Sequence, residues 1–127
     1  MKSLLTITAA IEGVTGLLLL TAPSFVSKLL LASSLEGSVA LIVARLTGLA
    51  LLTLTVACWL ARSDAETGAA NGLVTAFVLY NVGATALLVY AGIVLQLSGK
   101  FLWPAVLVHV VMGAWCIMRL LKGPLPE

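Results

Sequence analysis

Four long runs of apolar residues constrain this chain more than any other feature of its sequence. They extend approximately over residues 4–22, 39–61, 73–96 and 103–121. Each is longer than the ~18 residues that separate a membrane-spanning helix from a buried helix of a water-soluble protein. Strands of a membrane barrel would show alternating apolar residues over about ten positions, and the sequence has no such alternation. We therefore predict an all-α integral membrane protein with one transmembrane domain over residues 1–127.

Composition and charge agree with this class. Hydrophobic residues make up 61% of the chain and charged residues 9%, whereas soluble domains have roughly 25% charged residues. Short connections between the spans predict an up-down-up-down four-helix bundle. Lys and Arg are retained on the cytoplasmic side of a membrane. Four basic residues outside the spans lie on the side of the two termini (Lys2, Arg62, Arg119 and Lys122), and two lie on the other side (Lys28 and Lys100). We therefore expect both termini in the cytoplasm. The net charge of +2 then reflects topology and gives no argument for nucleic-acid binding.

The segment between the first two spans, PSFVSKLLLASSLEGS, is long and apolar for a simple loop. In a helix, a broad apolar face would form from Phe25, Val26, Leu29 and Leu30, as in a helix that lies in the membrane interface. Continuation of either neighbouring span accounts for the same residues equally well. The N-terminal stretch also resembles a signal peptide, but Glu12 interrupts its apolar region, so we expect a retained first span.

Each apolar run contains one costly polar residue, Glu12, Arg45, Asn81 or His109. A charge near the centre of a spanning helix costs about 2.5–3.5 kcal/mol, so these side chains should face protein or water rather than lipid. At about 1.5 Å per residue in a core about 30 Å thick, Glu12 lies about 12 Å from the inner edge and Arg45 about 9 Å from the outer edge. The same count predicts two layers, Glu12 with Asn81 and Arg45 with His109. If the second span begins at Leu35, Arg45 lies deeper and a Glu12–Arg45 ion pair becomes feasible.

Different interpretations stay open for these polar residues. Arg45 either faces the interior of the bundle or extends to the outer headgroups, because side chains tilt toward the N-terminus of their own helix. Glu12 is either a proton-carrying or ion-binding carboxylate or a protonated, hydrogen-bonded group that fixes helix packing. Asn81, in LYNVGAT, is typical of an interhelical hydrogen bond, which Tyr80 and Thr85 can join.

His109, in WPAVLVHVVMG, is the only histidine. Imidazole is a common axial ligand of haem, but one histidine supplies one ligand and no cofactor motif accompanies it. We favour a structural histidine bonded to a neighbouring helix, and we predict no cofactor and no metal site. Cys58 and Cys116 form no C-x-x-C pair, and the sequence lacks hydrolase elbows, zinc-binding helices and phosphate loops, so we assign no catalytic residue. The predicted polar intramembrane cluster consists of Glu12, Arg45, Tyr80, Asn81 and His109.

Small residues recur at a spacing of four on three of the spans. They are Ala9 and Gly13, then Ala40, Ala44 and Gly48, then Ala105 and Gly113 on either side of His109. Such spacing lets helix backbones approach closely in lipid. It supports packing inside the bundle or contact with partner proteins, without choosing between them.

Four segments carry a resemblance to a known group of proteins: GLLLLTAPS, ARLTGLALLTLT, YNVGATALL and LWPAVLVHVVMGAW. Together they resemble small, largely uncharacterised bacterial four-span membrane proteins of the DoxX-like type, over nearly the whole chain. The resemblance implies a multi-pass protein of the plasma (bacterial inner) membrane. Some relatives are regarded as membrane subunits associated with quinone-linked redox systems. No catalytic residue carries over, because the type has no defined catalytic motif to match.

These observations lead to three predicted functions. The first is a non-catalytic accessory or interaction subunit of a larger membrane complex, in contact with the lipid bilayer and with other membrane subunits or a second copy through its small-residue faces. Its loops are too short for a soluble domain, and packing surface is plentiful. The second is a small transporter or proton-relay protein that uses Glu12, Asn81 and His109. The third is a redox subunit that binds haem or quinone at His109.

Overall fold

Helices account for the architecture of the protein. The computed structural model describes residues 1–64 and 67–122, and this part of the chain contains helices without strands. The helices are α1 (Lys2–Thr21), α2 (Pro23–Leu31), α3 (Ser38–Ala61), α4 (Gly68–Ile93) and α5 (Leu102–Leu121). Of these, α1, α3, α4 and α5 are long and apolar enough to cross a membrane. The predicted all-α arrangement of four spans is confirmed, and it indicates a multi-pass membrane protein.

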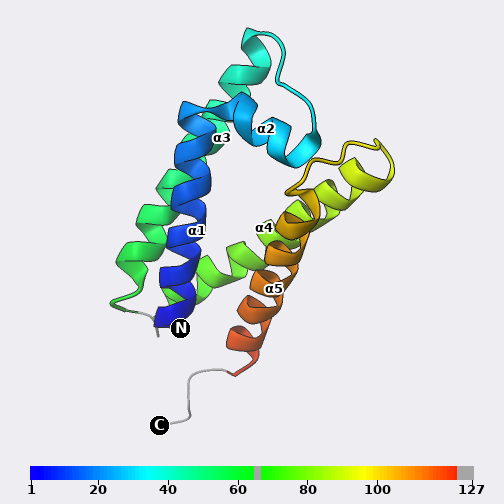
Figure 1. The fold of residues 1–127 in the computed structure, drawn as a ribbon. Coiled ribbons are helices and arrows are strands. Elements are labelled where there is room, and N and C mark those ends of the chain that lie inside the picture. The colour runs from blue at the N-terminus through cyan, green and yellow to red at the C-terminus, as the bar shows by residue number, and fades with distance from the viewer. Residues whose placement is uncertain (65–66, 123–127) are drawn as a thin grey trace.

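The spanning helices form two antiparallel pairs, α1 with α3 and α4 with α5 (Figure 1). The first pair is closest where two glycines meet: a Cβ on Gly48 would lie 2.7 Å from the carbonyl oxygen of Gly16 and 2.7 Å from the amide nitrogen of Leu20. The second pair is close at Gly113, whose added Cβ would lie 3.3 Å from the Cβ of Asn81. Small residues therefore bring the backbones together within each pair, as expected in lipid, where dispersion contacts hold helices together.

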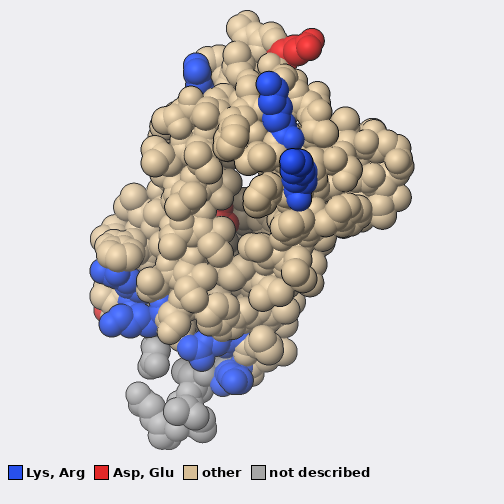
Figure 2. Space-filling view, in the orientation of Figure 1, with Lys and Arg blue, Asp and Glu red and all other residues tan. Residues whose placement is uncertain are grey.

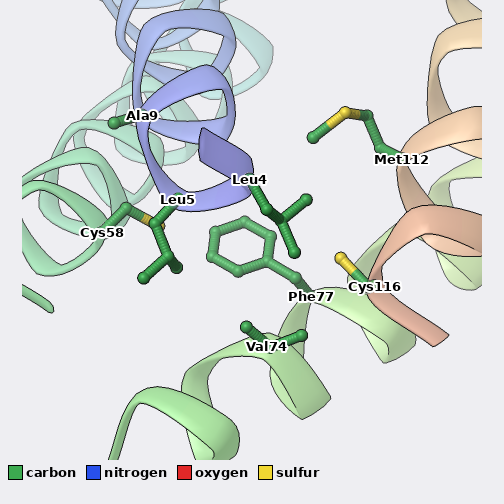
Figure 3. Close-up of a cluster of buried hydrophobic side chains, with 8 residues drawn as sticks. All are labelled: Leu4, Leu5, Ala9, Cys58, Val74, Phe77, Met112 and Cys116. Atoms are coloured by element: carbon green, nitrogen blue, oxygen red, sulfur yellow. The ribbon is translucent and has the colours of Figure 1, made fainter. Parts of the chain in front are cut away.

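The two pairs meet at the end of the bundle where α1 begins and α5 ends (Figure 1). A buried apolar cluster there draws side chains from all four spanning helices, and Figure 3 shows the ring of Phe77 among them. Its members are Leu4, Leu5, Ala9, Cys58, Val74, Phe77, Met112 and Cys116. This end of the bundle is therefore closed by apolar packing.

The opposite end is connected by α2. Ala22, with φ −137° and ψ 57°, breaks the helix between α1 and α2. The last turn of α2 is joined to the segment before α5 by two backbone hydrogen bonds: Gly99 N–H donates to the Leu30 carbonyl at 2.9 Å, and Phe101 N–H donates to the Leu29 carbonyl at 2.9 Å. A Cβ on Gly99 would overlap the Leu29 carbonyl, so only glycine fits. The separate short helix considered from the sequence is present.

The third span differs most from its predicted boundaries. The sequence predicts residues 73–96, whereas the helix is Gly68–Ile93. It begins earlier because the Thr67 hydroxyl accepts a hydrogen bond from the Ala70 N–H at 3.2 Å, which caps the helix within the predicted polar loop. It ends earlier because Gln96 adopts a φ of 56°, in the left-handed region, and turns the chain back. The other three spans agree with the prediction to within two residues.

Candidate functional site

Glu12 and Tyr80 connect the two helix pairs inside the bundle. Glu12 on α1 is only 5% exposed, and the Tyr80 hydroxyl on α4 donates a hydrogen bond to its Oε2 at 3.4 Å. The rings of Phe77 and His109 flank Tyr80 edge-on, with centroid distances of 6.1 and 5.6 Å. No Lys or Arg among the described residues pairs with Glu12. A buried carboxyl held only by a hydroxyl supports the interpretation in which Glu12 fixes helix packing.

Asn81 and His109 connect α4 with α5. The Asn81 amide Nδ2 donates to the Phe77 carbonyl at 2.8 Å, one turn earlier in the same helix. Its Oδ1 lies 3.0 Å from His109 Nδ1. The amide nitrogen of Asn81 faces the Phe77 carbonyl, so the oxygen Oδ1 is the atom that faces the imidazole. An amide oxygen can only accept a hydrogen bond, so Nδ1 of His109 must carry the proton. This fixes the tautomer, so that Nε2 of a neutral His109 is the acceptor nitrogen. The predicted interhelical asparagine and structural histidine thus bond to each other.

A small pocket lies between the two pairs at these side chains. It is lined by Thr8, Ile11, Glu12, Asn81, Val108, His109 and Met112. Its volume of about 10 Å³ is close to the ~10–15 Å³ that one water molecule needs. Among the described residues, neither the Thr8 hydroxyl nor His109 Nε2 makes a hydrogen bond. Figure 2 shows a hollow in one face of the molecule with an acidic side chain at its base. The pocket can hold a single water between hydrogen-bonding groups.

Arg45 does not join this cluster. It is exposed on α3 and makes no hydrogen bond or ion pair within residues 1–64 and 67–122. The two layers predicted from depth do not form, because His109 bonds to Asn81 instead. The Glu12–Arg45 ion pair is also absent, since α3 begins at Ser38 and Glu12 is buried while Arg45 is exposed. Residue counting predicted neither the face of the helix nor the relative depth: His109 lies in a pocket with Glu12, whereas Arg45 is level with the end of α1.

The pocket does not fit a haem or a quinone ring. A volume sufficient for one water leaves no space for either group unless the two helix pairs separate. The imidazole of His109 also makes an edge-on contact with the ring of Tyr80, at a centroid distance of 5.6 Å. For metal ions, no group of three or more His, Cys, Asp or Glu side chains gathers in the part of the chain that the structure describes.

The two cysteines belong to the apolar cluster rather than to the pocket. Cys58 is 0% and Cys116 1% exposed, and both are free thiols. Neither is placed for disulfide exchange, which needs an accessible thiolate.

Two residues of the interior were not among the predicted candidates. Thr8 lies one turn before Glu12 and lines the pocket, and Gly16 lies one turn after Glu12 and contacts Gly48. A spacing of four places Thr8, Glu12 and Gly16 on one face of a helix. This stripe of small and polar residues is the sequence signal that identifies the inward face of α1.

Comparisons of the chain with protein-family models, with curated proteins and with solved structures found no match. The resemblance to DoxX-like proteins therefore stays a prediction.

Proposed function

We propose that the protein is an accessory or interaction subunit of a larger membrane assembly, without a catalytic site of its own. The observation that carries this proposal is Arg45, a charged side chain that is exposed on a spanning helix and unpaired among the described residues. Gly48, one turn later in α3, packs against Leu19 and Leu20, so Arg45 is level with the end of α1 and costs less than the about 2.5–3.5 kcal/mol of a charge at the centre of a spanning helix. A neighbouring subunit that neutralises it would lower this cost, so the charge favours assembly.

The interior polar residues support the same proposal, because they form hydrogen bonds between helices. The Tyr80–Glu12 bond joins α4 to α1, and the Asn81–His109 bond joins α4 to α5. Interhelical hydrogen bonds in membrane proteins contribute about 0.6 kcal/mol on average, up to about 1.7 kcal/mol. The pocket beside them has room for one water, which is too small for an organic substrate. The first bond therefore holds the two pairs together, and the second holds α4 to α5 within the second pair.

The glycines of the small-residue faces considered from the sequence pack within the chain. Gly48 contacts Gly16, Gly13 lies against Thr55, and Gly113 lies against Asn81. These close approaches are used within the chain, so they are not free for another helix. A partner subunit would instead meet the exposed large side chains of the spanning helices.

We further propose that the protein lies in a bacterial inner membrane with both termini in the cytoplasm. The start of α1 and the end of α5 lie at the same end of the molecule (Figure 1). Lys2, Arg62 and Arg119 are at that end, and basic residues are retained on the cytoplasmic side. The test is labelling of single engineered cysteines in intact cells. A cysteine in the segment between α2 and α3 should react with an impermeant reagent, and one at the start of α1 should not.

The accessory function is tested by extracting the full chain from native membranes in mild detergent and identifying the proteins that co-purify. We expect a defined set of membrane proteins in fixed stoichiometry. A visible absorption spectrum of the same sample reports any haem protein in the assembly. Recovery of the chain as a lone monomer from every detergent tried would overturn the proposal.

A proton relay is the second candidate, because one observation favours it. Glu12 and His109, two groups that can bind protons, line the same water-sized pocket as the unbonded hydroxyl of Thr8. A single water there would link a carboxyl to an imidazole. The test is proton flux into vesicles that contain the purified protein and a pH-sensitive dye. Glu12→Gln should abolish the flux and Glu36→Gln, a carboxyl outside the spans, should not; flux that survives Glu12→Gln rejects the relay.

A further inference from the structure

Three polar atoms of the small pocket make no hydrogen bond within the described chain. The bond from Tyr80 uses Oε2 of Glu12 and leaves Oε1 without a partner. Nε2 of His109 and the hydroxyl of Thr8, a residue that is only 3% exposed, are also unbonded. All three atoms are reachable from the pocket, because Nε of Arg119 is the only unbonded side-chain nitrogen or oxygen among the described residues that is fully enclosed. Unpartnered polar groups in an interior are destabilising, so an occupant that bonds to all three would stabilise the fold.

The chemistry of these atoms defines the occupant. Oε1 of an ionised Glu12 and Nε2 of a neutral His109 can only accept hydrogen bonds, and the Thr8 hydroxyl can accept a third. No Lys or Arg of the described chain compensates the charge of the carboxylate. A primary ammonium group supplies three N–H donors and one positive charge. Water supplies two donors without a charge, an alcohol supplies one donor, and a quaternary ammonium supplies none. A primary ammonium therefore matches the pocket in both hydrogen bonding and charge.

The mouth of the pocket determines how such a group arrives. Of the lining residues, Val108 is 41% exposed and Ile11 is partly exposed, so the pocket opens between α5 and α1. Glu12 lies near the middle of α1, which places this apolar mouth at mid-membrane height, among lipid acyl chains. Figure 2 shows the hollow on the surface of the molecule, and the buried apolar cluster closes the inner end of the bundle. The occupant therefore enters from the lipid and carries an apolar chain.

We propose that the pocket binds the terminal ammonium group of a lipid-soluble primary amine, whose apolar chain extends through the mouth into the membrane. The amino group is about the size of the single water that the pocket can hold, and the rest of the molecule stays outside. Its bond to the Glu12 carboxylate is charge-assisted and contributes most to binding. The bonds from Tyr80 to Glu12 and between Asn81 and His109 stay in place, because the ligand uses the atoms that they leave free. This site does not depend on the accessory function.

The experiment uses the full chain in phospholipid nanodiscs, labelled with nitrogen-15 in histidine, with dodecylamine as the probe. His109 is the only histidine, so nuclear magnetic resonance reports one pair of ring nitrogens. We expect dodecylamine to shift the signal of Nε2, which gains a hydrogen bond, and to leave Nδ1, which already bonds to Asn81, nearly unchanged. Dodecanol and dodecyltrimethylammonium carry the same chain with one donor and with none, and they should not reproduce the shift.

Variants assign the shift to the pocket. Glu12→Gln should weaken dodecylamine binding about tenfold or more, because a hydrogen bond to a charged group is lost. Thr8→Val keeps the shape of the side chain and should weaken binding several-fold. Glu36→Gln removes a carboxyl outside the spans and should leave binding unchanged. An unaltered Nδ1 signal before the probe is added shows that a variant keeps the bond between Asn81 and His109.

Several outcomes would overturn the inference. They are an Nε2 signal that dodecylamine leaves unchanged, an equal shift with dodecanol or dodecyltrimethylammonium, and binding to Glu12→Gln as tight as to the unmodified protein. Where Glu12→Gln does not fold, undiminished binding to Thr8→Val has the same meaning. A joint shift of both ring signals would also overturn it, because the probe would then only change the protonation of the imidazole.

Discussion

Replacement of Gly48 by alanine should destabilise the protein more than any other single methyl group added to a spanning helix. The new Cβ would lie 2.7 Å from two backbone atoms of α1, the Gly16 oxygen and the Leu20 nitrogen, and 3.0 Å from the Cβ of Leu19. Backbone atoms cannot rotate away, so α1 and α3 must separate by about 0.7 Å to restore an ordinary contact of 3.4 Å. A gap of this size forfeits roughly a quarter to a half of each dispersion contact across the interface.

The expected magnitude follows from two opposing effects. Overpacking of a closely packed interface typically costs about 1–3 kcal/mol. Alanine is favoured over glycine within a helix by up to about 1 kcal/mol, which offsets part of that cost. We expect Gly48→Ala to lower the free energy of unfolding by about 1–2 kcal/mol. The measurement is reversible unfolding in mixed micelles by titration with sodium dodecyl sulfate, followed by far-ultraviolet circular dichroism.

Gly83→Ala is the matched control. Gly83 is also interior to a spanning helix, but a Cβ there meets nothing within 4 Å. Only the helix propensity changes, so stability should stay equal or rise by up to about 1 kcal/mol. If Gly48→Ala unfolds at the same detergent fraction as the unmodified protein, or if Gly83→Ala is destabilised equally, the close approach of α1 and α3 does not hold the first pair together.

Three further substitutions test the polar contacts. Asn81→Ala removes both hydrogen bonds of its amide and should cost about 1–2 kcal/mol in the same unfolding assay, whereas Asn71→Ala near the start of α4 should change stability little. Tyr80→Phe removes the hydroxyl that holds the buried carboxyl and should cost about 0.6 kcal/mol, and an equal loss for the exposed Tyr90→Phe would refute a specific contact. Thr67→Ala removes the cap of α4 and should speed amide hydrogen exchange in its first turn, with a cost of about 1 kcal/mol; unchanged exchange there would contradict the cap.

The spans could be predicted from the sequence because bilayer thickness sets a minimum length for an apolar run, and each run meets it. The start of α4 could not, since residues 68–72 are small or polar and their helical state depends on the Thr67 cap and on burial of Ala70. Hydropathy measures the free energy of transferring a residue into lipid. It contains no information about a hydrogen bond that begins a helix. Hydropathy also does not distinguish a separate short helix from the continuation of a neighbouring span, so α2 was predicted only as one of these two alternatives.

The candidate site was predicted in part. Glu12, Asn81 and His109 stand out because polar groups in an apolar run are costly, and the pocket brings these three together. Their pairing could not be predicted from depth, since the rotation of each helix decides whether a side chain faces a neighbour or the lipid. Arg45 shows this limit most clearly: the residue count places it at the depth of His109, yet it lies on the exposed face of α3 level with the end of α1, whereas His109 lies beside Glu12. The rotation is set by contacts such as Gly16 with Gly48, which depend on both helices together.

The backbone hydrogen bonds at the end of α2 also impose an order on how the protein is made. The carbonyls of Leu29 and Leu30 accept their bonds from Phe101 and Gly99, about 70 residues later in the chain. While a ribosome is still producing α4, these acceptors have no protein donor and depend on water or headgroups. The first helix pair can therefore enter the membrane early, but its outer end is completed only when the beginning of α5 arrives. The outer end of the first pair thus obtains its last hydrogen-bond donors only when the second pair has been synthesised.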